Sequence, residues 1–323
     1  MKKVIVFATG GTIACVYDKK TGGLIPALSG HDLIKAIPEL ENVCKLEIVE
    51  VSSEPSARIT PERMANLGNL INNALDDNNV AGAVVTHGTD TLEETAFFLS
   101  LVIKSDKPVC VTGAMRSSGE ICPDGALNIY NACRVAACDN AKDLGVLVVF
   151  NEFIFSAQDV IKTHSSSPAA FKSPVWGPLG YADNDKIIIR RKTIRDRVFN
   201  PVSFNFSVPI IKIYTDMDLD LLDFIVSKKV DGIIFEAFGR GNLSNKIIPY
   251  IKKLVSQNIP VIIATRTFGR VLDVYSYDGG FGDIIKKGVI SAGECPPNKA
   301  RLKLIACLGE KMSINEIKQA FDI

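Results

Sequence analysis

The sequence predicts an α/β protein built around parallel sheets. Short runs rich in β-branched residues alternate along the chain with amphipathic segments, and this alternation is typical of parallel sheets covered by helices. Several runs are apolar at consecutive positions, as expected of strands buried on both faces. The length of 323 residues corresponds to about two domains.

The predicted strands occur throughout the chain and are short. In the first half they are Lys3–Ala8, Leu46–Val51, Ala83–Thr86, Val109–Thr112 and Val146–Phe150. In the second half they are Ile187–Ile189, Ile210–Tyr214, Gly232–Phe235 and Val261–Ala264. We expect the amphipathic segments between them to be helices.

One helix is predicted to begin at Pro61. Thr60 precedes it as a candidate N-cap, and Glu62 lies in the first turn, where an acidic side chain is favoured. Apolar residues then follow at helical spacing, namely Met64, Leu67, Ile71 and Leu75.

The N-terminus imitates a secretory signal. Met1-Lys2-Lys3 precedes a run without charges, and Thr12-Ile13-Ala14-Cys15 resembles a lipoprotein cleavage box. Gly10-Gly11 interrupts the apolar run after a few residues, however. We therefore expect residues 3–8 to form a buried first strand.

The regular alternation lapses between about residues 165 and 208, where serines, prolines and the basic run Arg190-Arg191-Lys192 occur. This stretch is a plausible connection between two α/β domains. We expect an N-terminal domain over 1–186, a linker over 187–208 and a C-terminal domain over 209–323.

The composition excludes several classes of protein. Apolar residues make up 47% and charged residues 23% of the chain, which excludes disordered, collagen-like and coiled-coil proteins. The 37 basic and 36 acidic residues leave a formal charge of +1, so no net field attracts nucleic acid or an anionic membrane. No uncharged stretch approaches the ~20 residues of a membrane span. We predict neither a nucleic-acid nor a membrane partner.

The eight cysteines are predicted to be free thiols. They are too sparse for a disulfide scaffold, and none form a Cys-x-x-Cys pair. Several lie in apolar runs, such as Cys110. Buried free thiols fit a reducing compartment, so we expect a cytoplasmic protein.

Small polar residues and glycines follow four predicted strands. These segments are Thr9–Thr12, Ser52–Glu54, Thr86–Thr91 and Thr112–Arg116. In open parallel sheets ligands bind beyond the carboxyl ends of the strands. We therefore expect the functional site at this edge.

The chemistry of these segments favours some ligands over others. No lysine followed by serine or threonine comes after Gly10-Gly11, and no Gly-x-Gly-x-x-Gly is present there, so a nucleotide site is not supported. Thr89 or Asp90 can serve as an ordinary N-cap. The free amides of a helix start also favour a carboxylate, while Asp90 can accept an ammonium, and such a site suits an amino acid.

Metal and cofactor chemistry is not indicated. The three histidines, His31, His87 and His164, show no paired ligand spacing. We predict no metal and no cofactor. The available nucleophiles are threonines, with Lys162 as a candidate base if its surroundings favour the neutral amine.

Two motifs resemble the signatures of the bacterial-type L-asparaginases. They are Ala8-Thr9-Gly10-Gly11-Thr12-Ile13-Ala14 and His87-Gly88-Thr89-Asp90-Thr91-Leu92-Glu93-Glu94-Thr95-Ala96. Further similar positions are Val111–Arg116, Asp124-Gly125, Gly177–Gly180 and Asn298–Arg301. The resemblance implies a flavodoxin-like N-terminal domain, a smaller Rossmann-like C-terminal domain, and a homotetramer formed as a dimer of dimers with shared active sites.

The resemblance also implies two groups of catalytic residues. Thr12 resembles the nucleophilic threonine of the first group, while Thr89, Asp90 and Lys162 resemble the second group. The implied reaction hydrolyses L-asparagine to L-aspartate and ammonia through an acyl-enzyme on threonine.

The implied substrate contacts come from several segments. Ser53 resembles the serine that holds the α-carboxylate, and Glu54 lies near the position that meets the amino group. The backbone amide of Ala114 resembles part of the amide site, and Asn242 resembles an asparagine contributed by a neighbouring subunit. Thr89 and Asp90 complete the implied substrate contacts.

The chain departs from the family pattern at two positions. The family's lid tyrosine falls within Gly23–Leu24, and Tyr17 is the nearest phenol. The acidic partner of that tyrosine falls near Phe281, which Asp278 and Asp283 flank. The same chemistry on glutamine or a modified or D-configured amide, and a non-catalytic amino-acid-binding paralogue, therefore remain the alternatives.

Overall fold

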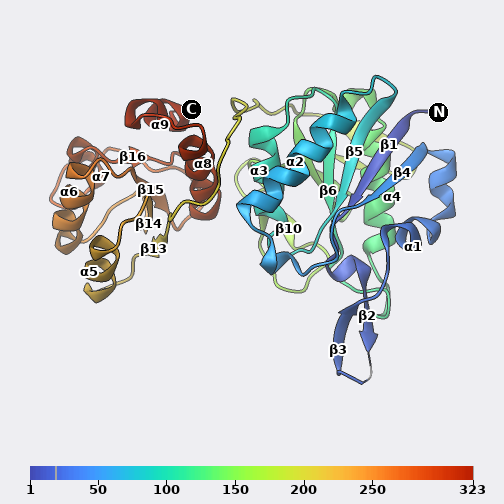
Figure 1. Ribbon diagram of the computed structural model, residues 1–323, viewed down its shortest axis with the longest axis horizontal. Coiled ribbons are helices and arrows are strands. Elements are labelled where there is room, and N and C mark those ends of the chain that lie inside the picture. Colours follow the sequence, from blue (N-terminus) through green and yellow to red (C-terminus); the bar gives the residue numbers. More distant parts are fainter. Residues whose placement is uncertain (19, 323) are drawn as a thin grey trace. The chain divides into compact units, whose positions relative to one another are not determined.

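Figure 1 shows a computed structural model of the protein. The structure describes residues 1–18 and 20–322, without the side chains of Tyr17, Leu24 and Pro26. It divides into two compact units, Met1–Val198 and Phe199–Ile323. Each unit contains its own parallel sheet, which confirms the predicted two-domain α/β class.

An eight-stranded sheet forms the centre of the first unit as described. Its parallel part contains, in spatial order, β4 (Lys45–Glu50), β1 (Lys3–Ala8), β5 (Val80–Thr86), β6 (Val109–Thr112) and β7 (Val146–Phe150). In chain order these strands run 2-1-3-4-5, the flavodoxin-like arrangement. The direction of winding therefore reverses between β1 and β5, where such sheets bind their ligands.

Helices cover both faces of this sheet (Figure 1). On one face α2 (Pro61–Leu75) and α3 (Leu92–Val102) bury apolar side chains, and on the other α1 (Gly30–Lys35) and α4 (Gly125–Ala136) do so. Thr60 caps α2 by accepting a hydrogen bond from the Arg63 N–H. Apolar burial along α2 follows the predicted spacing at Met64, Leu67, Ile71 and Leu75.

Several short strands extend the first unit. The sheet continues antiparallel through β8 (Phe153–Ser156), β11 (Gly180–Ala182) and β12 (Ile187–Ile189). Separate antiparallel pairs join β2 (Cys15–Asp18) to β3 (Gly23–Pro26), and β9 (Ile161–Lys162) to β10 (Phe171–Lys172). The sequence predicts only β12 among these, because strands of two to four residues carry too little periodic pattern.

The second unit is built on a four-stranded parallel sheet in its described residues. The strands are β13 (Ile210–Lys212), β14 (Ile233–Ala237), β15 (Val261–Thr265) and β16 (Ile290–Ser291). Its helices are α5 (Asp220–Ser227), α6 (Ile248–Ser256), α7 (Phe281–Ile284), α8 (Pro297–Gly309) and α9 (Ile314–Phe321).

Short 3₁₀ turns connect several elements. Those next to the functional edge are η1 (Thr12–Ala14) and η3 (Ser56–Arg58). The others are η2 (Pro38–Asn42), η4 (Asp139–Ala141), η5 (Asn245–Ile247) and η6 (Ile285–Lys287).

Candidate active site

The two signature motifs lie at the switch point of the first sheet. Thr12 begins η1 shortly after β1, and Thr89 and Asp90 lie between β5 and α3. Strands β1 and β5 are hydrogen-bonded neighbours, with Ala8 aligned to Thr86. The predicted position of the site, at the carboxyl ends of the strands, is thus where the topology brings these loops together.

The two loops touch through glycines. A Cβ atom placed on Gly11 would lie 2.3 Å from the Cα of Gly88, and one on Gly88 would lie 3.2 Å from the Cα of Gly11. Gly11 also has a φ of +89°, a conformation that other residues rarely adopt. The glycines of both motifs therefore allow direct backbone contact, which places Thr12 and Thr89 on adjoining loops.

Lys162 joins the second group of predicted catalytic residues. Its Nζ donates to the Thr89 Oγ1 at 2.9 Å and to the Asp90 Oδ1 at 3.0 Å. The Lys162 side chain is 16% exposed and that of Asp90 is 71% exposed, while Thr89 is buried. The structure therefore brings a hydroxyl, an amine and a carboxylate into one hydrogen-bonded cluster.

Local structure fixes the backbone of Lys162. The residue lies on β9, opposite Phe171 of β10, and its N–H donates to the Glu93 carboxylate. Glu93 belongs to the first turn of α3, the helix that follows Thr89 and Asp90. The backbone of Lys162 is thus hydrogen-bonded to the first turn of the helix that directly follows its partners, Thr89 and Asp90.

A buried histidine supports the Thr89 loop from behind. The His87 Nδ1 lies 2.7 Å from the Gly88 carbonyl oxygen, so it donates, and the Nε2 accepts from the Thr95 Oγ1 at 2.9 Å. Complete burial lowers the pKa of His87 to about 4. His87 therefore stays neutral at physiological pH and acts as a fixed brace for the peptide before Thr89.

Ala114 lies on a loop that side chains hold in place. The Asp124 carboxylate accepts hydrogen bonds from the N–H groups of Met115 and Arg116 at 3.1 and 2.9 Å. The Asn128 Nδ2 donates to the Gly113 carbonyl at 3.0 Å. Ala114 is buried, and a Cβ on Gly113 would lie 3.4 Å from the Thr89 Cγ2, so this loop adjoins the catalytic cluster.

The polar residues of the segment after β4 lie in three different surroundings: a cavity, a surface ion pair and a buried contact. Ser53 lines a cavity beside Gly10, and the Glu54 carboxylate forms an ion pair with Arg63 of α2. Ser56 is buried, and its Oγ would lie 2.8 Å from a Cβ on Gly88. Its carbonyl oxygen accepts from the Thr91 Oγ1 at 2.8 Å.

Ser56 is the site candidate that the sequence interpretation missed. It lies beyond the strand-end segment 52–54, inside η3. Only its contact with the Gly88 loop brings it to attention, and a contact between residues so distant along the chain leaves no periodic or spacing signal in one sequence.

Asn242 belongs to the second unit. It forms an isolated bridge with Phe238, and its Oδ1 accepts from the N–H of Phe281 at 3.1 Å. Asp283 pairs with Lys287 at 2.5 Å, and this hydrogen bond lowers the pKa of Asp283. The role of Asn242 in a site shared between subunits stays a prediction.

The hairpin after Thr12 contains the position of the family's lid tyrosine. In the register of β2 and β3, Tyr17 is directly opposite Leu24. The backbone therefore places the nearest phenol-bearing residue across from the predicted lid position, while the side chains of Tyr17 and Leu24 lie outside the described part.

The described residues hold neither a metal-binding cluster nor a membrane-spanning helix. Within residues 1–18 and 20–322, no group of three or more His, Cys, Asp or Glu side chains is arranged to hold a metal ion. Within the same residues, no helix has the length and apolar content to cross a membrane.

The chain resembles known proteins along nearly its whole length. It matches the family model described as "Asparaginase, N-terminal" over residues 3–195 and the model described as "Glutaminase/Asparaginase C-terminal domain" over residues 207–321. An L-asparaginase of Bacillus licheniformis is 36% identical, with 95% of each chain covered. A glutaminase-asparaginase of Acinetobacter glutaminasificans is 32% identical, with 98% of each covered.

A solved structure shows the same fold. The crystal structure of a probable cytoplasmic L-asparaginase from Campylobacter jejuni superimposes with a TM-score of 0.88, at 31% sequence identity and with 99% of each chain covered. Together with the two family models, which account for the N-terminal and C-terminal units in turn, this likeness confirms the resemblance inferred from the motifs: the chain belongs to the bacterial-type L-asparaginase family.

Proposed function

We propose that this protein hydrolyses L-asparagine to L-aspartate and ammonia. The observation that carries the proposal is the pair of hydrogen bonds from Lys162 of β9 to Thr89 and Asp90, whose loop contacts the Thr12 loop. The relatives reported above bear the names L-asparaginase and glutaminase-asparaginase, which supports a carboxamide as the group that is cleaved.

In the proposed reaction the Thr12 hydroxyl attacks the side-chain carboxamide carbon. The C–N bond breaks as the amide nitrogen receives the proton of the Thr12 hydroxyl and leaves as ammonia. A water molecule then hydrolyses the acyl ester, which releases aspartate and restores the Thr12 hydroxyl. Lys162 lies within proton-transfer reach of the Thr89 hydroxyl, so this pair supplies a proton route at the site. The buried loop at Ala114 supplies a backbone amide to the oxyanion, a contact of the kind that typically contributes about 3–4 kcal/mol.

Asp90 and Glu54 are proposed to receive the substrate ammonium. Asp90 is the more accessible of the two because its side chain is 71% exposed. Each carboxylate already forms an ion pair, Asp90 with Lys162 and Glu54 with Arg63, so exposure separates the two, and the Glu54 side chain is only 33% exposed. We therefore assign the main ammonium contact to Asp90 and a secondary contact to Glu54.

Two serines compete for the substrate α-carboxylate. The motif assigns Ser53, whereas burial and contact with Gly88 favour Ser56. We expect Ser56→Ala to lower kcat/KM about tenfold or more, as losing a hydrogen bond to a charged group typically does, and Ser53→Ala to change it less than threefold. The opposite ranking, measured under identical conditions, restores the assignment to Ser53.

The decisive experiment measures ammonia release from L-asparagine, L-glutamine and D-asparagine at matched concentrations. We expect L-asparagine to give the highest kcat/KM. Since L-glutamine differs by one methylene, discrimination against it of about 10–200-fold is the expected range for an apolar pocket. Saturable aspartate binding by calorimetry without any ammonia release would instead identify a non-catalytic amino-acid-binding protein.

Threonine variants test the assigned nucleophile. Thr12→Ala and Thr89→Val are each expected to abolish most turnover while leaving the melting temperature close to that of the parent. Mass spectrometry of the parent with substrate should show an acyl adduct on Thr12. A near-normal kcat in either variant contradicts its role.

We further propose a cytoplasmic homo-oligomer, a dimer of dimers in which Asn242 completes the neighbouring site. All eight cysteines lie within the described residues and none of them forms a disulfide, which supports a reducing compartment. Light scattering should report a tetramer, and Asn242→Ala should lower activity without dissociating it. A monomer with full activity would falsify the shared-site proposal.

A further inference from the structure

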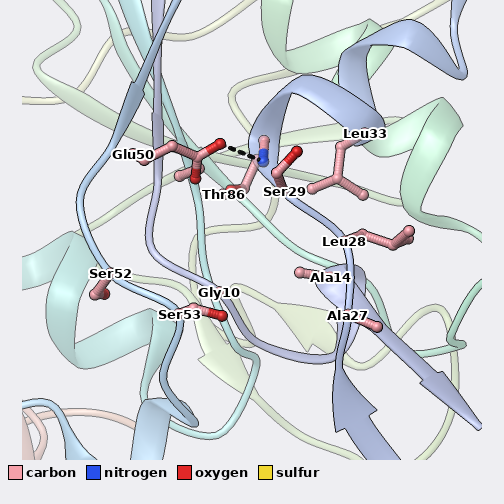
Figure 2. A pocket seen from close by; sticks show the side chains of 12 residues that line it. Gly10, Ala14, Ala27, Leu28, Ser29, Leu33, Glu50, Ser52, Ser53 and Thr86 are labelled. Carbon is pink, nitrogen blue, oxygen red and sulfur yellow. Dashed lines mark hydrogen bonds between the residues drawn. The ribbon is translucent and has the colours of Figure 1, made fainter.

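The cavity that Ser53 lines lies beside the catalytic edge, on the face of the sheet that α1 covers. Its volume is about 320 Å³, at the small end of the range for ligand pockets. The lining residues come from the ends of β1, β4 and β5, from both ends of the hairpin β2–β3 and from the start of α1 (Figure 2). The proposed catalytic residues do not line it, whereas Ser53, the motif's candidate for the substrate α-carboxylate, does.

One row of the sheet forms the polar side of this cavity. Ala8 of β1 is aligned with Glu50 of β4 on one side and with Thr86 of β5 on the other. Neighbouring strands lie about 4.8 Å apart, so the carboxylate and the hydroxyl flank the small Ala8 side chain. All three residues of the row line the cavity together with Gly30, which packs closely on the row: a Cβ atom on Gly30 would lie 2.8 Å from the Ala8 Cβ.

The polar atoms in this row have unused hydrogen-bonding capacity. Thr86 is 1% exposed, and its Oγ1 has no hydrogen-bond partner in the described structure. The Glu50 side chain is 46% exposed, and its Oε1 accepts from the Gly30 N–H at 2.7 Å (Figure 2) and lies 3.5 Å from the His31 Nδ1. Its other oxygen accepts no hydrogen bond from the described residues. Since an unsatisfied buried hydroxyl costs free energy, a donor placed in the cavity is favoured.

The opposite side of the cavity is apolar. Ala14, Ala27, Leu28 and Leu33 lie across from Glu50 and Thr86 in Figure 2. Among the described lining residues Glu50 is the one ionisable group. The cavity therefore combines a single negative charge with a short apolar wall, and it offers no cationic side chain to a carboxylate.

We propose that this cavity binds a small primary alkylammonium ion. The ammonium group donates to the Glu50 carboxylate and the Thr86 hydroxyl, and the alkyl chain packs against the alanine and leucine side chains. An amino acid is disfavoured because its carboxylate would face Glu50. This site adjoins the proposed asparaginase site through Ser53, which lines the cavity, and its occupancy does not depend on catalysis.

The test is a titration of the full-length protein with n-butylammonium, followed by calorimetry and by chemical shifts of the methyl groups. Butanol and butyrate of the same chain length serve as neutral and anionic probes, and ammonium chloride tests the apolar wall. We expect saturable binding of n-butylammonium, with butanol and ammonium each at least about tenfold weaker, since a charge-assisted contact or a buried chain is missing. Butyrate should not bind.

Three variants locate the site. Glu50→Gln keeps an acceptor for the Gly30 N–H, yet it should weaken n-butylammonium binding about tenfold, and Thr86→Val should weaken it about threefold. Glu47→Gln is the matched control, because Glu47 lies on the same strand and its carboxylate pairs with Lys3. This control should bind as the parent does.

Specific outcomes overturn the proposal. Unchanged affinity in Glu50→Gln, or butyrate binding as tightly as n-butylammonium, removes the charge argument. Ammonium chloride binding as tightly as n-butylammonium removes the role of the apolar wall. If Thr86→Val fails to fold, Thr86→Ser replaces it and should retain the parent affinity because the hydroxyl remains.

Discussion

The two threonines of the proposed site are held in place by different means. The Thr89 hydroxyl accepts from Lys162, which also contacts Asp90, and His87 braces the peptide that precedes Thr89. In the described structure no hydrogen bond fixes the Thr12 side chain. Its position follows instead from backbone contact between Gly11 and Gly88.

The two halves of the site therefore respond differently to substitution: the Thr89 half depends on side-chain hydrogen bonds, and the Thr12 half depends on backbone packing. Side-chain substitutions in the Thr89 half remove proton donors and acceptors, but they leave the backbone contact intact. Substitutions in the glycine half displace the loop itself. The first kind should affect rate more than stability, and the second kind should affect both.

The largest expected effect belongs to Lys162→Met. We predict a loss of kcat of about 10²–10⁴-fold, because the proton route through Thr89 disappears, with a change in melting temperature below about 3 °C. Steady-state ammonia release and thermal melting measure the two quantities. Lys172→Met, on the adjoining strand β10, is the control and should retain full kcat, whereas a full-rate Lys162→Met would remove the lysine from the scheme.

Gly11→Ala should lower kcat nearly as much as Lys162→Met does, and it should also lower the stability of the protein. A Cβ atom 2.3 Å from the Gly88 Cα and a φ of +89° force the two loops apart, at a cost of about 3–4 kcal/mol of unfolding free energy. Urea denaturation measures that cost. Gly22→Ala is matched to it, since its φ is +68° and nothing lies within 4 Å, and should cost only about 1–2 kcal/mol.

The His87 brace predicts a pH dependence of stability. The folded pKa of about 4 lies below the unfolded value of about 6.5, so unfolding takes up a proton between these values. The free energy of unfolding should therefore fall, by up to about 3 kcal/mol from this group, as the pH decreases from about 6.5 to 4.

Denaturation series across this pH window test the prediction with His87→Gln. In that variant the free energy of unfolding should depend less steeply on pH, because the contribution of His87 is absent. His31→Gln, at an exposed histidine beside the Glu50 carboxylate, is the comparison variant, and its slope shows how much an exposed histidine contributes. An identical slope in the parent and in His87→Gln would show that another group dominates.

The smallest effect is expected at Asp124, which supports the Ala114 loop. Asp124→Asn replaces the carboxylate that accepts from the N–H groups of Met115 and Arg116, so we predict a loss of about 1–2 kcal/mol in stability and about tenfold in kcat. Asp139→Asn on the surface is the control. Unchanged kcat in Asp124→Asn would mean that the loop keeps its position without this carboxylate.

Much of the fold follows from local patterns, and the short elements do not. Five consecutive apolar residues in β7 (Val146–Phe150) and the capped α2 are strong signals, and the structure contains both as predicted. The sequence does not predict the pairs β2–β3 and β9–β10, because strands of two to four residues are too short to show a periodic pattern. The second of these pairs carries Lys162, so its contact with Thr89 is a consequence of tertiary pairing.

The site itself was predictable only in part. Thr12, Thr89 and Ala114 follow strands, so the topology of a parallel sheet brings them to one edge. The burial of Ser56 against Gly88 and the pairing of Glu54 with Arg63 depend on how the segment after β4 folds back. No spacing rule in a single sequence encodes that path, and the roles of these residues stay predictions.

The contact between Gly11 and Gly88 also limits how such an enzyme can diversify. A side chain at Gly11 would displace the Gly88 loop, and one at Gly88 would displace Ser56. A change toward a longer or differently shaped amide is therefore accommodated more readily at exposed or half-buried positions such as 53 and 54. The centre of the site tolerates the fewest substitutions, although it contributes no side chain of its own.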